Sequence, residues 1–364
     1  METLLTDKNT NETNNILLKK GLIIAGPCSA ESEQQLLHTA SGLAHLGKVD
    51  VLRAGIWKPR TNPGGFEGIG IKALPWLQKA KQISGLKTAV EVATAKHVED
   101  ALNFEVDILW IGARTTVNPF SVQQIADALK ETNATVLIKN PVSPDIKLWI
   151  GAIERIQKAG IKNIGLIHRG FTSYGNTEFR NVPMWQIPIE MKRLYPKLPL
   201  ICDPSHICGN REGLLSIAQK SLNLDYDGLI IESHYNPETA LTDKNQQITP
   251  TELSILLKNL VHKKGTSNEK DFLMKLDYLR EQISSLDEEL LTLISNRMNV
   301  VKEIGKIKKE SQITVLQTSR YNEILGRAIK KGASVHLSED FIKSYMEALH
   351  IESIQIQNTI ITEK

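Results

Sequence analysis

The chain has 364 residues, of which 41% are hydrophobic and 23% charged, values typical of a soluble globular protein with two domains. The net charge of +3 is spread along the chain without a basic tract, so neither nucleic acid nor a membrane surface is a predicted partner. Three cysteines are too few for a disulfide framework, and the polar N-terminus has no signal- or transit-peptide pattern. These features predict a cytoplasmic protein in a reducing compartment.

Short apolar runs of β-type residues alternate with amphipathic segments after a polar lead-in at 1–20. The eight runs are at 22–26, 51–55, 88–92, 108–113, 135–140, 163–169, 198–203 and 227–234. Strands that are apolar throughout are buried on both faces, which predicts a parallel sheet. Eight such units in residues 21–262 predict a (β/α)8 barrel. A doubly wound open sheet is the alternative, but the turn after its first strand should be rich in glycine, and Gly26-Pro27-Cys28 is not.

Reactive or charged residues lie at or near the ends of these runs. They are Cys28, Arg53, Arg114, Lys139, Arg169, His206 and Glu232. The C-terminal ends of barrel strands converge on one face, where barrel enzymes carry their active sites. We therefore predict a catalytic site on that face. A buried space-filling role is the alternative for Cys28.

Four of the residues expected on this face are good metal ligands: Cys28, His206, Glu232 and Asp243. A thiolate, an imidazole and two carboxylates suit Mn, Fe, Co or Zn better than Mg or Ca. No short ligand spacing supports them, so a capping or core role for His206 and a turn role for Asp243 remain alternatives.

The same face gathers cations. Residues 51–63 carry Arg53, Lys58, Arg60 and Thr61, and Arg114, Lys139 and Arg169 follow on later strands. Crowded cations repel one another unless anionic ligands compensate them, and arginine forks suit carboxylates and phosphates. Six cations exceed the need of one phosphate, which predicts two phosphorylated substrates, one of them also a carboxylate. Ordinary surface ion pairs are the alternative.

Residues 20–260 resemble the beta subclass of type I 3-deoxy-D-arabino-heptulosonate 7-phosphate (DAHP) synthases. The motifs, in the family's order, are GPCSAE, LRAGIWKPRT, IGAR, DPSH, IIESH and LTDKNQQ. The resemblance implies condensation of phosphoenolpyruvate with erythrose 4-phosphate, the entry step to aromatic biosynthesis. One departure is IKNP at 138–141, where many relatives read lysine, arginine, glycine.

The resemblance also implies roles for individual residues. The family's metal ligands match Cys28, His206, Glu232 and Asp243. Its phosphoenolpyruvate-binding cations match Arg53, Lys58, Arg114, Lys139 and Arg169, and Arg60 and Thr61 match the groups that hold the phosphate of erythrose 4-phosphate. No organic cofactor is implied.

For the chemistry, we expect a metal to polarise the aldehyde and Lys58 to deliver a proton, with a pKa lowered by neighbouring cations. We expect Cys28 and His206 to take part in catalysis as metal ligands. The related synthase that uses arabinose 5-phosphate is the rival, but it carries Asn where Pro59 stands.

A polar linker at 263–270 separates the predicted barrel from a three-helix domain at 271–364, with helices expected at 271–310, 318–331 and 338–361. Arg297 and Lys308 are eleven residues apart, about 16 Å along one helix face. Arg280 lies about 25 Å before Arg297, too far to share a compact ligand within one chain. If all three cations are functional, a second, antiparallel copy must complete the site, which predicts a homodimer. Solvated helix charges are the alternative.

This domain resembles the all-helical chorismate mutases over 271–360, through LREQISSLDEELLTLISNRMNVVKEIGKIK, SRYNEIL and ESIQIQ. The resemblance implies a Claisen rearrangement that needs neither metal nor cofactor. It implies that Arg297 and the partner's Arg280 grip the substrate carboxylates, and that Lys308 and Gln357 bind the ether oxygen as catalytic residues. Arg320 and Ser353 match supporting positions, while Tyr321 stands where many relatives carry Glu.

The two reactions are not consecutive, so substrate transfer gives no reason for the fusion. We hypothesise that the helical domain senses chorismate or prephenate and restrains the barrel, an allosteric coupling. The alternative is a dimerisation or effector-sensing module with weak catalysis.

Overall fold

The structure is a computed structural model that describes residues 15–58, 64–175, 177–263, 267 and 269–362. It divides into two compact units, Met1–Gly265 and Thr266–Lys364, and the division falls within residues 263–270. Among the described residues, every helix is too short or too polar to span a bilayer.

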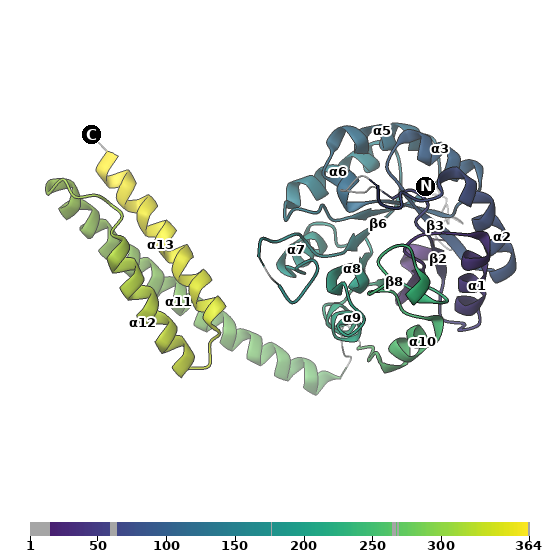
Figure 1. The fold of residues 1–364 in the computed structure, drawn as a ribbon. Helices are drawn as coiled ribbons and strands as arrows, with labels where there is room; N and C mark the ends of the chain where they lie inside the picture. Colours follow the sequence, from purple (N-terminus) through teal and green to yellow (C-terminus); the bar gives the residue numbers. More distant parts are fainter. Residues whose placement is uncertain (1–14, 59–63, 176, 264–266, 268, 363–364) are drawn as a thin grey trace, which may run out of the picture. The chain divides into compact units, whose positions relative to one another are not determined.

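The first unit is a barrel of parallel strands that pair in sequence order, and β1 closes the ring by pairing with β8 (Figure 1). In the described part of the chain these strands are β1 Leu22–Gly26, β2 Val51–Arg53, β3 Lys87–Val92, β4 Ile108–Ile111, β5 Thr135–Lys139, β6 Asn163–His168, β7 Leu200–Cys202 and β8 Gly228–Glu232. This confirms the predicted (β/α)8 barrel. An open sheet is excluded because it would leave two edge strands unpaired.

Helices surround the strands as a ring in Figure 1. The longer ones are α1 Glu33–Ala44, α2 Leu74–Ser84, α3 Ala95–Asn103, α5 Pro119–Leu129, α6 Ile146–Lys158, α7 Gln186–Leu194, α9 Leu214–Asn223 and α10 Pro250–Asn259. The short ones are α4 Ala113–Thr116, α8 Pro204–Cys208 and the 3-10 turns η2 Ile16–Leu18, η3 Gly70–Ala73 and η4 Pro237–Thr239. Several helices begin where a side chain caps the first turn, as Asp145 does for α6 and Thr249 for α10.

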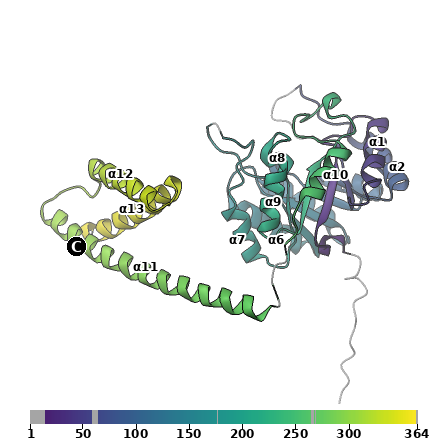
Figure 2. The same ribbon diagram turned by 90° about the horizontal axis from the view of Figure 1, so that it is seen from below.

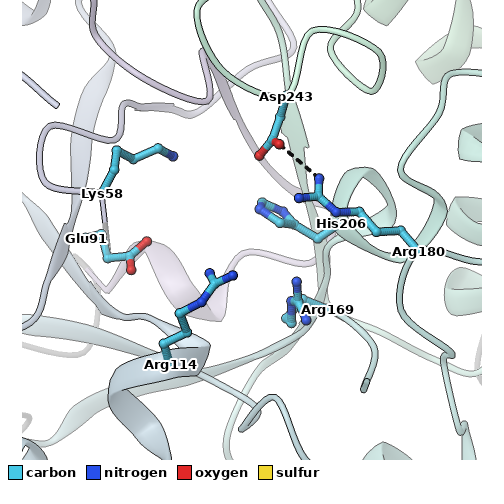
Figure 3. A pocket seen from close by; sticks show the side chains of 7 residues that line it. All are labelled: Lys58, Glu91, Arg114, Arg169, Arg180, His206 and Asp243. Carbon is cyan, nitrogen blue, oxygen red and sulfur yellow. Dashed lines mark hydrogen bonds and ion pairs between the residues drawn. The ribbon is translucent and has the colours of Figure 1, made fainter. Parts of the chain in front are cut away.

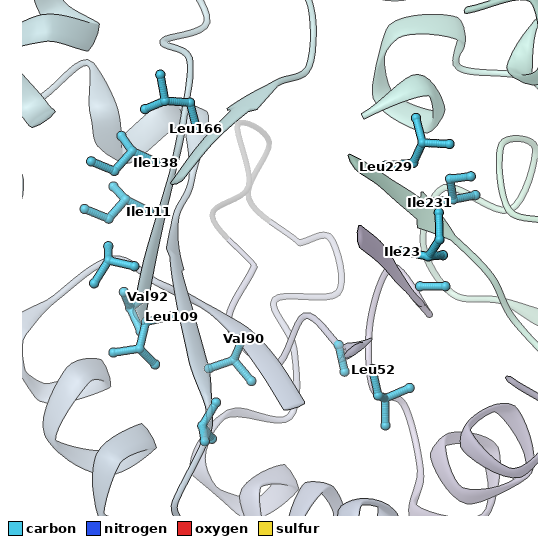
Figure 4. Packing of buried hydrophobic residues seen from close by; sticks show 14 of the residues in the cluster. Ile23, Leu52, Val90, Val92, Leu109, Ile111, Ile138, Leu166, Leu229 and Ile231 are labelled. Atoms are coloured by element: carbon cyan, nitrogen blue, oxygen red, sulfur yellow. The ribbon is translucent and has the colours of Figure 1, made fainter. Parts of the chain in front are cut away.

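Alternate residues of each strand point to opposite sides of the barrel wall. Those pointing outward pack under the helices, as Val90 and Val92 of β3 and Leu109 and Ile111 of β4 do (Figure 4). The residues between them point into the barrel, where a second core contains Ile24, Val51, Ala89, Ile108, Trp110, Leu137, Ile167, Ile201 and Ile230. The interior is thus packed apolar, and a polar residue two positions further along a strand must lie above this core.

Gly26 ends β1 at a point where no side chain fits. Its φ of +152° is disfavoured for other residues, and a Cβ would lie 2.0 Å from the Arg53 carbonyl oxygen. The close backbone approach of β1 and β2 brings the turn that carries Cys28 against Arg53.

The second unit consists of the three predicted helices, α11 Lys270–Glu310, α12 Thr318–Ser334 and α13 Glu339–Thr362. Its small core joins α11 to α13 through Met298, Val301 and Leu349. In Figure 2, α11 extends well beyond the part that α12 and α13 cover. Apolar side chains remain exposed along it: Leu279, Ile283, Leu286, Leu290, Leu291 and Leu293. One copy of this unit therefore leaves much of α11 unpaired.

Candidate functional site

The strand alternation that builds the barrel core also places charged groups above it. Arg53 follows Val51, Lys139 follows Leu137 and Glu232 follows Ile230 by two residues, so all three point inward. Arg169 comes two residues after Ile167 in the same way. All four are at least nine-tenths buried.

The predicted metal ligands lie together at this end of the barrel. Ligand atoms of Cys28, Glu232 and Asp243 are all within 4.8 Å of one another. The Cys28 thiol donates to Asp243 Oδ2 at 3.3 Å, and His206 Nε2 lies 3.7 Å from Glu232 Oε1. We call these four residues the metal-ligand cluster.

The environment of the cluster fits a cation. His206 Nδ1 is bonded to Asp203 Oδ1 at 2.9 Å, which leaves Nε2 directed toward Glu232 and available as a ligand. Burial would raise the pKa of Asp243, but Arg180 and His206 lower it to about 2. Burial, helped by Glu232, raises the pKa of Cys28 to about 12. A buried thiol beside two carboxylates holds its proton tightly, and a metal ion that bound its sulfur would displace that proton.

Residues of the GPCSAE and LTDKNQQ motifs hold the metal-ligand cluster together. The Cys28 backbone N–H donates to Gln247 Oε1 at 2.9 Å, and Gln247 Nε2 donates to the Thr242 carbonyl at 2.8 Å. The Ser29 and Thr242 hydroxyls lie 2.6 Å apart. The loop that carries Asp243 is therefore attached to the turn that carries Cys28, and this joins ligands 215 residues apart.

Arg53 lies directly behind the cluster. Its Nη1 is 3.1 Å from Glu232 Oε1, its Nη2 donates to the Cys28 carbonyl at 3.1 Å, and its guanidinium lies 5.1 Å from the Trp110 ring centre. Burial alone would lower the pKa of Arg53, but Glu232 and Cys28 raise it. Lys139 is paired in the same way with Asp203, at 2.9 Å.

In front of the cluster is a pocket, the barrel pocket, whose lining side chains converge in Figure 3. They are Lys58, Glu91, Arg114, Arg169, Arg180, His206 and Asp243. Arg169 Nη1 donates to Asn181 Oδ1 at 2.6 Å, and neither Arg169 nor Arg114 forms an ion pair with a described carboxylate. Burial lowers the pKa of Arg169 to about 10, with Arg180 and Arg114 acting in the same direction. Asp203 and Glu91 offset this lowering only in part, and two guanidinium groups without an ion-pair partner among the described residues suit the pocket to an anion.

Lys58 connects the pocket to the cluster. Its Nζ donates to the Cys28 carbonyl at 2.7 Å and lies 3.0 Å from Cys28 Sγ. Burial would lower the pKa of Lys58, but Cys28 and Glu232 outweigh it and raise the pKa. The predicted lowering is therefore wrong, because the neighbouring acids outweigh the neighbouring cations. Lys58 is a protonated ammonium group that can donate a proton.

In the second unit, four predicted site residues lie on α11 and α13 and are called the helical cluster: Arg297, Lys308, Ser353 and Gln357. Arg297 Nη1 donates to Ser353 Oγ at 2.8 Å, and Lys308 Nζ donates to the Val315 carbonyl at 2.6 Å. Gln357 is buried, and its Oε1 has no partner among the described residues.

Two further predicted arginines lie on exposed surfaces of this unit. Arg280 is 66% exposed and approaches Asp277 at 3.4 Å. Arg320 is exposed and pairs with Glu323 at 2.7 Å, while the next residue, Tyr321, stacks on His350. The described chain therefore does not bring Arg280 to Arg297, and their joint use depends on a second copy.

Comparison with protein families matches both units. Residues 14–267 match the model of the DAHP synthetase I family, and residues 279–358 match the model of chorismate mutase type II. The chain belongs to the DAHP synthetase I family. Its C-terminal unit is a chorismate mutase type II domain, so both predicted resemblances are confirmed.

Relatives of this DAHP synthetase I family member include the phospho-2-dehydro-3-deoxyheptonate aldolase of Thermotoga maritima. It is 33% identical over 226 residues, which cover 62% of this chain and 64% of that protein, less than two thirds of its length. The 2-dehydro-3-deoxyphosphooctonate aldolase of Caulobacter vibrioides is 28% identical over 66% of this chain and 86% of that protein. A crystal structure of the Thermotoga maritima DAHP synthase superposes with a TM-score of 0.58 at 30% identity, covering 65% of this chain and 67% of that one.

Several polar residues of the barrel site were not predicted from the sequence. Glu91 points inward two residues after Ala89, and Asp203 follows Ile201 in the same way, so strict counting of alternate positions would have found both. Glu91 Oε2 accepts from Trp110 Nε1 at 3.0 Å. Arg180 lies in a loop, where no periodic pattern marks it.

The departure at IKNP also has a structural account. Asn140 Oδ1 accepts from the Arg169 backbone N–H at 2.7 Å, and its amide donates to the Gly170 carbonyl at 2.9 Å. It joins the end of β5 to the end of β6 and so helps to position Arg169. The predicted contacts of Arg60 and Thr61 lie outside the described residues.

Proposed function

We propose that the barrel catalyses the metal-dependent condensation of phosphoenolpyruvate with erythrose 4-phosphate to DAHP and phosphate. The observation that carries this proposal is the cationic barrel pocket directly beside the metal-ligand cluster. The pocket suits a phosphorylated carboxylate, and the cluster suits an ion that would polarise a carbonyl group.

The chain's own residues divide the work. Arg114 and Arg169 hold phosphoenolpyruvate, with Lys139 and Arg53 contributing positive charge from behind. The C3 carbon of phosphoenolpyruvate forms a bond with the aldehyde carbon, water adds at C2, and the C2–O bond to phosphate breaks. Lys58, being protonated, donates a proton to the aldehyde oxygen as it becomes a hydroxyl group.

The metal-ligand cluster would hold one divalent ion. Its thiolate and imidazole favour the softer ions Mn, Fe, Co and Zn over Mg and Ca, and a bound ion would act as a Lewis acid toward the aldehyde. Metal-replete protein should lose phosphoenolpyruvate turnover on chelation and regain it when one of these ions is added back.

Arabinose 5-phosphate is the alternative aldehyde, because relatives of that aldolase class match this chain at 28% identity. The residues expected to select the aldehyde, at 59–61, favour erythrose 4-phosphate through the KPRT motif. Parallel assays with both aldehydes decide between them: the proposal requires erythrose 4-phosphate to be turned over much faster.

We further propose that the helical unit rearranges chorismate to prephenate as a homodimer. The helical cluster provides Arg297 for a carboxylate and Lys308 with Gln357 for the ether oxygen, on which negative charge grows in the transition state. Ser353 holds Arg297, and Arg320 remains a proposed supporting residue at the edge of the site.

The second copy is needed for two physical reasons. The apolar side chains exposed along the N-terminal half of α11 require a partner surface. Arg280 lies about 25 Å from Arg297 along the same helix, so only an antiparallel copy can bring it to the same substrate.

The fusion itself supports a regulatory proposal. We infer that chorismate or prephenate bound at the mutase site restrains the synthase. We also infer that the enzyme works in the cytoplasm. Prephenate should inhibit phosphoenolpyruvate turnover by the full chain but not by the Arg297→Ala variant. Equal inhibition of both would contradict this coupling.

One pair of assays tests both activities. Phosphoenolpyruvate loss and chorismate loss are followed on the same preparation with and without chelator. The first should stop and the second should continue. If chorismate is not consumed, the helical unit is a dimerisation or effector-sensing module instead.

A further inference from the structure

An aromatic pair lies beside the helical cluster and has no role in the function proposed so far. The rings of Tyr321 on α12 and His350 on α13 are stacked, with centroids 4.0 Å apart and planes 23° from parallel. Both side chains are half-buried. One ring of the stack is on α12 and the other is on α13, so the packing of the two helices fixes the orientation of the His350 imidazole.

The position of His350 on α13 directs it toward the helical cluster. His350, Ser353 and Gln357 are spaced by three and four residues, so they lie on one face of the helix. Ser353 in turn accepts the hydrogen bond from Arg297. His350 is therefore one helical turn from a residue that contacts the proposed carboxylate anchor.

The electrostatics of this position favour a neutral imidazole. Burial lowers the pKa of His350, and the positive charge of Arg297 lowers it further. A neutral imidazole has one nitrogen that donates and one that accepts, so it suits an uncharged hydroxyl group better than a carboxylate.

We propose that His350 is a further substrate-binding residue of the mutase site, that it hydrogen-bonds the ring hydroxyl of chorismate, and that Tyr321 holds its ring in place. This inference rests on the proposed mutase function. The two carboxylates of chorismate are assigned to arginines and the ether oxygen to Lys308 and Gln357, so the hydroxyl is the one remaining polar group without a partner. The phenol ring of Tyr321 acts as a support rather than as a substrate contact.

The variants separate contact from support. In the full-length chain, His350→Ala should raise KM for chorismate about tenfold with a smaller change in kcat, because a hydrogen bond made in both ground and transition states is lost. His350→Gln should recover part of this loss, since an amide also donates and accepts. Tyr321→Phe should stay within about twofold of wild type, whereas Tyr321→Ala, which removes the stack, should resemble His350→Ala.

The decisive probe is a chorismate analogue without the ring hydroxyl. If His350 binds that group, wild type and His350→Ala should turn over the analogue with equal kcat/KM, although they differ with chorismate. A penalty of the same size on both substrates would overturn the proposal and show that His350 acts only on the fold. So would a Tyr321→Phe loss as large as that of Tyr321→Ala, because the phenol hydroxyl would then be the contact.

Two controls distinguish this inference from the function on which it rests. His336→Asn changes an exposed histidine at a positive φ that asparagine tolerates, and it should leave mutase kinetics unchanged. If wild type does not consume chorismate, the proposed mutase function fails and the inference falls with it. If wild type is active and His350→Ala has wild-type kinetics, this inference alone is overturned.

Discussion

The two units hold their charged groups in opposite ways. In the barrel, Arg53 and Glu232 form an ion pair with side chains 2% and 0% exposed, and Lys139 and Asp203 form another with 5% and 0%. In the helical unit, Arg280 is 66% exposed. The strands of a barrel bring their C-terminal ends together on one face, whereas a straight helix spreads its residues along a line. In the proposed helical site, Arg280 therefore comes from a second copy.

The largest effect is expected when a buried ion pair of the barrel is broken. Lys139→Met removes the cation beside Asp203, and breaking such a pair costs about 3–5 kcal/mol because a buried charge is left uncompensated. We expect the free energy of barrel unfolding to fall by that amount and phosphoenolpyruvate turnover to fall more than about 100-fold. Chorismate turnover by the folded chain should not change.

Urea denaturation and the two substrate assays measure these effects. The matched control is Lys130→Met, which removes an exposed lysine paired with Asp127 at 2.7 Å and should alter little. Equal losses of stability and turnover in both variants would mean that the buried Lys139–Asp203 pair matters no more than the exposed Lys130–Asp127 pair.

The second prediction tests whether the helical site is shared between copies. Arg280→Ala and Arg297→Ala should each lower chorismate turnover more than about 100-fold, as expected when a charged contact to a carboxylate is lost. Co-expression of the two variants should restore roughly a quarter of wild-type activity, since half of the dimers are mixed and each mixed dimer has one intact site. Neither variant expressed alone should show this recovery.

Arg327→Ala, which changes an exposed residue of α12, is the control for co-expression and should be fully active in either pairing. Absence of recovery in the mixed dimers, with both chains folded, would mean that each copy carries a complete site. The contrast between the two units would then be lost.

The third prediction concerns the acid sensitivity of the barrel. His168 is fully buried, its Nε2 donates to the Pro183 carbonyl and its Nδ1 accepts from Tyr226, and burial lowers its pKa to about 4. The unfolded chain binds a proton at about pH 6.5, so stability from neutral His168 is present above that pH and is lost toward pH 4. At pH 5 the loss is about 2 kcal/mol.

The measurement compares wild type with His168→Asn by denaturation at pH 8 and pH 5. The difference in unfolding free energy between the two proteins should shrink by about 2 kcal/mol at the lower pH. A difference that is independent of pH would show that protonation of His168 does not cause the loss of stability in acid.

The smallest effect concerns the support of the metal ligands. Gln246 Nε2 donates to Glu232 Oε2 at 2.6 Å, and its Oε1 accepts from Arg180 at 2.6 Å. Gln246→Met removes the donor without changing charge, and the loss of such an outer contact weakens metal binding about tenfold or more. Metal titration of the full chain measures it, with Gln123→Met as an exposed control. Unchanged metal affinity would mean that Gln246 does not support the metal ligands.

Much of the barrel site was predictable where its residues follow the alternation of inward and outward side chains along a strand. The inward positions of Arg53, Lys139 and Glu232 follow from alternation along each strand, and Glu91 and Asp203 obey the same rule although they were not predicted. No comparable rule marks Arg180, which lies in a loop and reaches the pocket through its bonds to Asp243 and Gln246.

The sequence by itself determined the order of the elements, the parallel barrel, the three helices and the placing of Cys28, Arg53, Lys139 and Glu232 at one end of the barrel, because these depend on local periodicity and strand ends. Only the tertiary structure decided which charges pair. The direction of the Lys58 pKa shift depends on Cys28 and Glu232, and the orientation of His206 depends on Asp203. Such effects fall steeply with distance and rise with burial, and neither quantity can be read from spacing along a chain.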